Sequence, residues 1–285
     1  MKFTAATFVG LLTLAAVSCM NPETHVRRSS LMDYLYPKQA VAPSPSAAGA
    51  RLQLPLKLGI AFVPETTVSW RVQGVLTAAQ EKPLVDVVRK AFKDKPWVAE
   101  IKFIPSTYLR PRGGFDNLEQ VARMYGVDVI ALLSVDQIQY TDPRWYSFTY
   151  LSIVGAFVLP GDANDTRTLI DAAVFDVSSR TFILRAPGQS QVKGSSTWAA
   201  RDPQLREHSG KGFQLAITEL AKNLDSEVAS FKAEVASGDR KGVDVVDRKG
   251  VSLWESKGQN FGGSIGVLEI LAGLGLLGFL RWRNR

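Results

Sequence analysis

The stretch VDVIALLSVDQIQY, residues 127–140, decides the fold of this chain. It is the longest run with the character of a β-strand. Its centre, with Ile130, Leu132 and Leu133, is apolar enough to lie in the middle of a sheet. The segments on either side of it determine the fold class to which that sheet belongs.

Strand and helix patterns alternate around this stretch. A helix opens at Pro83 with apolar residues at helical spacing, and Asp116 and Gly126 mark the start and end of another. The sequence predicts strands at 56–63, 101–104, 168–177 and 181–186, a turn at 178–180, a break at Pro187-Gly188 and a last helix at 204–235. This order predicts an α/β (mixed α+β) fold, a single three-layer-like sheet-and-helix domain over residues 51–236.

Residues 1–18 have the features of a secretory signal peptide, with Lys2 followed by an apolar run and small residues. The run ends in Ala16-Val17-Ser18-Cys19, which resembles a bacterial lipobox. That resemblance implies that lipoprotein-processing enzymes attach diacylglycerol to Cys19, the only cysteine, and that membrane lipid is a partner. Met20 follows the cysteine, and the absence of aspartate at this position resembles lipoproteins that are sent on to the outer membrane. The alternative is a buried cysteine beside an ordinary cleavage site.

Two polar segments flank the predicted domain. Residues 19–50, rich in Pro, Ala and Ser, predict an extended tether after the lipidated cysteine. Within it we expect His25 and the pair Arg27-Arg28 to be solvated or to contact anionic lipid. Residues 237–261 predict a linker, in which Asp-Arg-Lys-Gly-Val occurs twice at a period of eight and is compatible with a short hairpin.

The last segment, residues 262–285, begins with Gly262-Gly263-Ser264, continues with an apolar stretch and ends in a cluster containing Arg281, Arg283 and Arg285. The apolar stretch of 16 residues corresponds to about 24 Å of helix, less than a hydrocarbon core of about 30 Å. It is therefore a marginal transmembrane helix. The three arginines predict that this end is retained in the cytoplasm.

This C-terminal segment resembles the GlyGly-CTERM sorting signal, which rhombosortases process. These are rhomboid-type intramembrane proteases. With the lipobox at the other end, the whole chain resembles the rhombotarget lipoproteins. The resemblance implies cleavage near Gly262, Gly263 and Ser264. Glu269, inside the apolar stretch, departs from the usual uncharged pattern. The alternative is a permanent C-terminal anchor.

The order of elements, with VDVIALLSVD at 127–136 and VFDVSSRTFILRAPG at 174–188, resembles the periplasmic domain of curli-secretion channel lipoproteins. This resemblance implies a topology and carries no site residues. The apolar stretch Tyr146–Leu159 has two interpretations. It is either a pair of core strands bent at Gly155 or a hairpin that joins other copies in a membrane pore.

No catalytic constellation, metal-ligand spacing or cofactor motif stands out in the predicted domain, so we expect no enzyme, metal or cofactor. His208 is its only histidine. The pattern Gly-x-Ser-x-Gly at 262–266 lacks the preceding strand of a hydrolase elbow. The net charge is +7, and it falls to about +4 without the terminal cations and Glu269, which does not favour nucleic acid.

The sequence therefore predicts a non-enzymatic lipoprotein of a Gram-negative bacterium. We expect it to be exported, to be anchored by lipid in the outer membrane or at the cell surface, and to bind an unidentified envelope protein or polymer. Before processing, its C-terminal helix holds it in the inner membrane. Two alternatives stay open: an oligomeric secretion or pore component, and an exported hydrolase that uses a Ser with His208 or a Lys.

Overall fold

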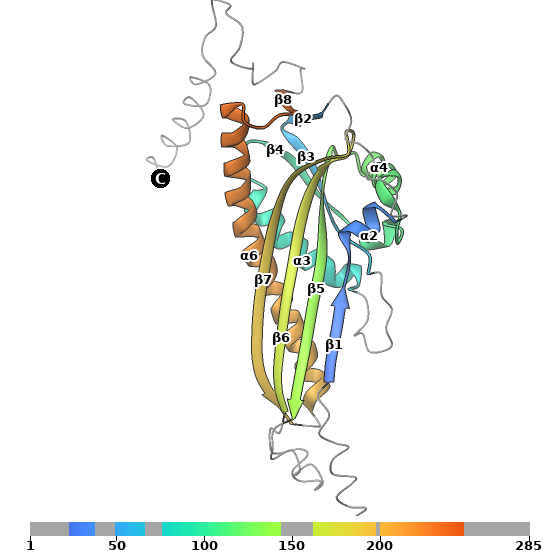
Figure 1. Cartoon of the computed structure of the whole chain (residues 1–285), viewed down its shortest axis with the longest axis vertical. Helices are drawn as coiled ribbons and strands as arrows, with labels where there is room; N and C mark the ends of the chain where they lie inside the picture. Colours follow the sequence, from blue (N-terminus) through green and yellow to red (C-terminus); the bar gives the residue numbers. More distant parts are fainter. Residues whose placement is uncertain (1–22, 38–48, 66–75, 144–161, 198–199, 248–285) are drawn as a thin grey trace, which may run out of the picture.

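The computed structural model describes residues 23–37, 49–65, 76–143, 162–197 and 200–247 (Figure 1). The helices and strands in chain order are β1 (Glu23–Arg28), α2 (Leu31–Leu35), β2 (Ala50–Leu54), β3 (Leu56–Phe62), α3 (Ala78–Phe92), β4 (Val98–Ile104), the 3₁₀ turn η1 (Ser106–Tyr108), α4 (Gly114–Tyr125), β5 (Val129–Pro143), β6 (Asp162–Asp176), β7 (Thr181–Ser196), α6 (Arg201–Ser237) and β8 (Val243–Asp247).

One main sheet organises the domain, with strand order β4-β3-β5-β6-β7. The strands β4, β3 and β5 are parallel, whereas β5, β6 and β7 are antiparallel. One edge of β5 pairs with β6 along its whole length. The other edge pairs with β3 over Val129–Leu133 and then with β1 over Asp136–Thr141. The prediction that residues 127–140 form a central strand is confirmed.

Each face of the sheet carries its own apolar core, because successive side chains of a strand point to opposite faces. On one face, α3 and α6 pack on residues such as Ala131 and Leu133. On the other face, α2 and α4 pack on Ile130 and Leu132. Helices thus cover both faces of one sheet, and the predicted mixed α+β class is confirmed.

The sheet extends beyond these cores into a part that we call the distal half: β1, residues 136–143 of β5, 162–169 of β6 and 189–196 of β7. Here the first half of α6 lies on polar side chains. Gln137 Nε2 donates to Thr168 Oγ1 at 2.8 Å, and Ser209 Oγ donates to Gln137 Oε1 at 2.6 Å. Gln139 Nε2 donates to the carbonyl of Leu205 at 2.8 Å. Buried polar groups need such partners, and these bonds determine how α6 lies on the sheet.

The hairpin β6–β7 is much longer than predicted, and Pro187-Gly188 does not break it. Pro187 is tolerated because β7 is an edge strand, where a missing N–H costs no ladder hydrogen bond. Its carbonyl accepts a hydrogen bond from Asn223 Nδ2 at 2.7 Å. Gly188 lies where the backbone of α6 passes close to β7. The predicted turn at 178–180 is present.

Two segments predicted as linkers contribute to the domain. Residues 23–28 and 31–35 of the predicted tether form β1 and α2, and Tyr34 and Leu35 are buried. Residues 243–247 form β8, which pairs in parallel with β2. Most of the second repeated motif lies outside the described residues, so the hairpin stays a prediction. Both corrections have the same cause, since short strands gain backbone partners and burial only from distant parts of the chain.

Two helices begin earlier than predicted. The helix α3 starts at Ala78, where Thr77 and Gln80 form a capping box, so Pro83 lies inside it. The helix α4 starts at Gly114 and has Asp116 in its first turn, and Gly126 ends it in the left-handed conformation, as predicted. In the part of the chain that the structure describes, no helix is long and apolar enough to span a membrane.

Candidate functional site

Most of the site residues predicted from the sequence lie outside the described residues. These are the lipidation site Cys19, the cleavage region Gly262, Gly263 and Ser264, and the cytoplasmic cluster Arg281, Arg283 and Arg285. The same holds for the signal peptide and for Tyr146–Leu159. Their roles stay predictions.

His208 lies on α6 with its ring against Gly194 of β7, where an added Cβ would be 2.3 Å from Cε1. Its Nδ1 is buried and has no hydrogen-bond partner among the described residues. The hydroxyl of the neighbouring Ser209 donates to Gln137 Oε1. The ring of His208 thus packs against β7 at Gly194, and Ser209 belongs to the polar contacts between α6 and the sheet.

The helices that connect the parallel strands lie on opposite faces of the sheet, so the connections diverge at the carboxyl ends of β3 and β5. The chain leaves β3 through α3 on one face to reach β4, and leaves β4 through α4 on the other face to reach β5. In open sheets of this kind, ligands bind outside the carboxyl ends at such a switch point. Here β1 lies there, paired with β5 directly beyond β3. We call residues 23–36, which comprise β1 and α2, the N-terminal arm.

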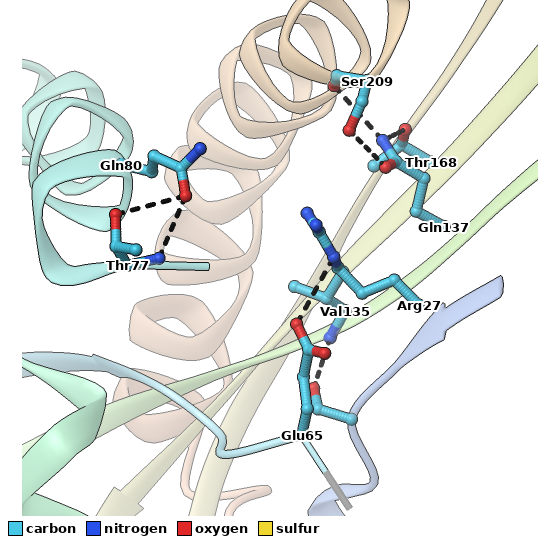
Figure 2. A network of polar contacts seen from close by, with 9 residues as sticks. Arg27, Glu65, Thr77, Gln80, Val135, Gln137, Thr168 and Ser209 are labelled. Atoms are coloured by element: carbon cyan, nitrogen blue, oxygen red, sulfur yellow. Dashed lines mark hydrogen bonds and ion pairs between the residues drawn. The ribbon is translucent and has the colours of Figure 1, made fainter. Parts of the chain in front are cut away.

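An ion pair joins the arm to the end of β3 (Figure 2). Arg27 Nε lies 3.4 Å from Glu65 Oε1, with only 11% and 8% of the two side chains exposed. The guanidinium also lies 5.6 Å from the centre of the Phe213 ring on α6. Burial lowers the pKa of Arg27 and raises the pKa of Glu65, and the attraction between the two charges opposes both shifts.

A second carboxylate lies close to this pair. Glu81 on α3 is 1% exposed, and its Oε2 accepts a hydrogen bond from the backbone N–H of Ser106 at 3.1 Å. Burial raises the pKa of Glu81, and the hydrogen bonds from Ser106 oppose the shift. The charge of Glu81 in turn contributes to the raised pKa of Glu65. The switch point therefore holds two buried carboxylates and one cation.

These carboxylates give the stability of the domain a defined pH dependence. Because the pKa of Glu81 is raised on folding, the folded chain binds more protons between the unfolded and folded pKa values. Its free energy of unfolding therefore falls as pH rises through that window. Glu81→Gln keeps an oxygen for the Ser106 N–H and cannot ionise.

We expect Glu81→Gln to be more stable than the unmodified chain at neutral pH and to show a flatter dependence above about pH 4.5. Denaturant titrations at several pH values measure this. The control is Glu100→Gln on the exposed side of β4, which should leave the slope unchanged. An equally steep dependence in Glu81→Gln and the unmodified chain would contradict the assignment.

The rest of the arm is held by hydrogen bonds and ring packing. The N–H of Ser29 donates to the Val135 carbonyl, and Ser29 Oγ accepts from the Val135 N–H, both at 2.8 Å. The hydroxyl of Tyr34 donates to Asn117 Oδ1 at 3.2 Å, and burial raises the pKa of Tyr34. The rings of Tyr36 and Phe115 pack edge to face, with their centres 5.9 Å apart. The arm thus completes both the sheet and the core under α4.

The opposite face of the distal half is open in the described residues. The core beneath α2 and α4 reaches no further along β5 than Leu132. Beyond it, Tyr140 and Leu169 are exposed, and Arg167 lies over the Tyr140 ring while it pairs with Asp165 at 3.1 Å. We call this surface the outer distal face. It combines apolar area with charges that are paired among themselves.

Local residue patterns barely mark the switch-point residues. Arg27 falls in the predicted tether, so it was expected to be solvated or to contact anionic lipid. In the structure it is buried, and it contacts Glu65 and the ring of Phe213. Ser30 is the one usable signal: its Oγ accepts the N–H of Asp33, a helix start of the form Ser-x-x-Asp. Nothing local marks Glu65 or Glu81.

No family model matches this chain, and no curated protein matches it. Solved structures with a similar arrangement include a homologue of the neuraminyllactose-binding hemagglutinin from Helicobacter pylori, with 8% identity, 65% of this chain and 95% of that chain covered, and a TM-score of 0.37. PelC from Paraburkholderia phytofirmans, described as a dodecamer, has 10% identity, 70% and 99% coverage and a TM-score of 0.27. XCC0632 from Xanthomonas campestris, of family DUF330, is 14% identical. The match covers 67% of this chain and 93% of that chain, with a TM-score of 0.30.

Proposed function

We propose that this chain is an exported, non-enzymatic lipoprotein of a Gram-negative envelope, anchored by diacylglycerol on Cys19. The domain would bind another envelope protein or polymer. Support comes from the lipobox-like Ala16-Val17-Ser18-Cys19 and from the position of the arm. Only residues 20–22 separate Cys19 from β1. An anchor at Cys19 would therefore lead directly into the folded domain.

The second part of the proposal concerns the other end. A rhomboid-type protease would cut near Gly262-Gly263-Ser264 and release the C-terminal helix, so that the lipid becomes the remaining anchor. This is supported by the order of Gly-Gly-Ser, a short apolar stretch and the arginine cluster. A 16-residue apolar stretch is short for a stable span, which favours a transient anchor.

The intact mass of the protein purified from its native envelope tests both parts. We expect a diacylated Cys19 at the N-terminus and no residues after the cleavage region, with the C-terminal segment present in a strain that lacks the rhomboid-type protease. The matched variant Cys19→Ser should carry no lipid and should leave the membrane fraction once the C-terminal segment is removed. A chain that ends at Arg285 in both strains would sink the sorting proposal.

A second candidate is a component of an oligomeric secretion or pore assembly. The observation that favours it is the sheet edge: β7 is the last strand, and no strand pairs with its outer edge in the described parts of the chain. Side chains of α6 cap only part of it, as where Glu219 accepts the N–H of Gln189 at 3.0 Å. Ring-shaped particles of the detergent-purified protein would support this candidate, and a strictly monomeric native mass would count against it.

A further inference from the structure

The arm enters the domain at one extreme of its long axis. Glu23 pairs with Thr141, and the ladder between β5 and β6 ends two residues later at the pair Pro143–Asp162. The helix α6 begins at the same place, where Arg201 pairs with Asp162 at 2.8 Å. We call this the distal end, and it lies at the bottom of Figure 1.

The chain between the anchor and this end is very short. Four residue steps lead from Cys19 to Glu23, and a fully extended chain covers at most about 14 Å in that length. The arm cannot lengthen this connection while it remains docked. Ser29 binds it to β5, Arg27 to Glu65 after the end of β3, and Tyr34 to α4, through the contacts described above.

The opposite end lies far from it. The helix α6 has 37 residues, which corresponds to about 55 Å. It runs from the Asp162 contact to the start of β7, where the Arg240 guanidinium donates to the carbonyl of Ile183. The pair β2–β8 lies at this proximal end, at the top of Figure 1, and Arg51 of β2 is exposed there.

We propose that the distal end of the domain is a membrane-facing surface that rests on the lipid head groups, with the long axis of the domain directed away from the membrane. This rests on the proposed lipidation of Cys19. The docked arm sets the distance, and the partner of the surface is lipid. The proximal end then stands roughly the length of α6 away from the bilayer.

The cross-strand row next to this end suits a lipid interface. Thr24, Tyr140, Asp165 and Lys193 lie side by side across β1, β5, β6 and β7. Tyr140 and Lys193 are exposed. An amphipathic ring and a long cationic side chain are the groups that settle at head-group level.

Attached probes test the orientation. Cys19 is the only cysteine, so a cysteine introduced into the lipidated chain is its one free thiol. Lys193→Cys and Arg51→Cys replace two exposed basic residues at opposite ends. Each protein, with a thiol-linked fluorophore, is placed in phosphatidylethanolamine–phosphatidylglycerol vesicles that carry a head-group nitroxide. We expect strong quenching at position 193 and little at position 51. Equal quenching, or the reverse order, would overturn the proposal.

Lengthening the link tests whether the arm sets the distance. Six Gly/Ser residues inserted between Met20 and Asn21 add up to about 20 Å of reach. We expect the quenching at position 193 to fall severalfold, and unchanged quenching would overturn the role of the arm. Intact mass separates this result from the proposed function. Absence of lipid on Cys19 refutes the anchor, whereas a lipidated chain without quenching at position 193 refutes only the orientation.

Discussion

Replacing Gly188 with alanine should loosen α6 from the sheet and lower the free energy of unfolding by about 3 kcal/mol. A Cβ at this position would lie 2.1 Å from the carbonyl oxygen of Ala216 and 2.5 Å from the nitrogen of Leu220. Both are backbone atoms of α6, so no flexible side chain can move aside. The helix would have to shift as a body, and it would lose packing in the core around Ile217 and Leu220, both fully buried.

The matched control is Gly210→Ala, on the same helix. An added Cβ there meets nothing within 4 Å, and Gly210 is exposed. Alanine should stabilise the helix by about 0.5–1 kcal/mol, because it restricts the unfolded chain and favours helix. Denaturant unfolding followed by circular dichroism measures both variants. If Gly188→Ala were as stable as Gly210→Ala, the close approach of α6 to β7 would be wrong.

Replacing Arg27 with methionine should cost about 3–5 kcal/mol at neutral pH. The change leaves the Glu65 carboxylate, 8% exposed, without the cation that lies 3.4 Å away. It also removes the contact of the guanidinium with the Phe213 ring. The arm should therefore detach more easily than in the unmodified chain, and hydrogen exchange at the backbone amides of β1 should report this directly.

The neighbouring residue provides the control. Arg28 pairs with Asp136 at 2.9 Å, but 56% and 34% of these side chains are exposed. Arg28→Met should therefore cost less than about 1 kcal/mol. Equal losses in Arg27→Met and Arg28→Met would show that burial of the Arg27 pair does not matter.

The loss in Arg27→Met should also depend on pH. Burial raises the pKa of Glu65, and removing the opposing cation raises this pKa further. The folded variant therefore binds a proton more readily than its unfolded form, and its stability falls as pH rises through the raised pKa. At acidic pH, where Glu65 is protonated in both states, the destabilisation should shrink. The double variant Arg27→Met/Glu65→Gln should recover part of the loss at neutral pH.

Features that follow from the spacing of residues within one helix or strand could be predicted from the sequence. The central strand β5 was recognised because Ile130, Leu132 and Leu133 are apolar on both faces, which marks a strand covered on both sides. The helix α6 was recognised by its stripe of apolar residues, of which Phe213, Ile217 and Leu220 are buried as expected. Gly126 marked the end of α4 because a left-handed residue there favours glycine.

The candidate site could not be predicted in the same way. Arg27 and Glu65 are 38 positions apart in the sequence, and neither lies in an apolar pattern. Their burial arises only after β1 pairs with β5, more than 100 residues away in the chain. Similarly, β2 and β8 are short strands that pair across almost the whole domain. A short polar strand carries no periodic signal, because its partners and not its own residues determine whether it forms.

The amino-acid sequence by itself determined the fold class, the central strand, the long helix and the turn between β6 and β7, because each follows from residue spacing or turn chemistry within a few positions. Only the tertiary structure decided that residues 23–36 are a docked arm, that Arg27 faces Glu65, and that the start of β1 lies at the distal end. These features depend on which strand edges remain free once the sheet has formed. The unpaired backbone groups at a free edge bind a segment that reaches them.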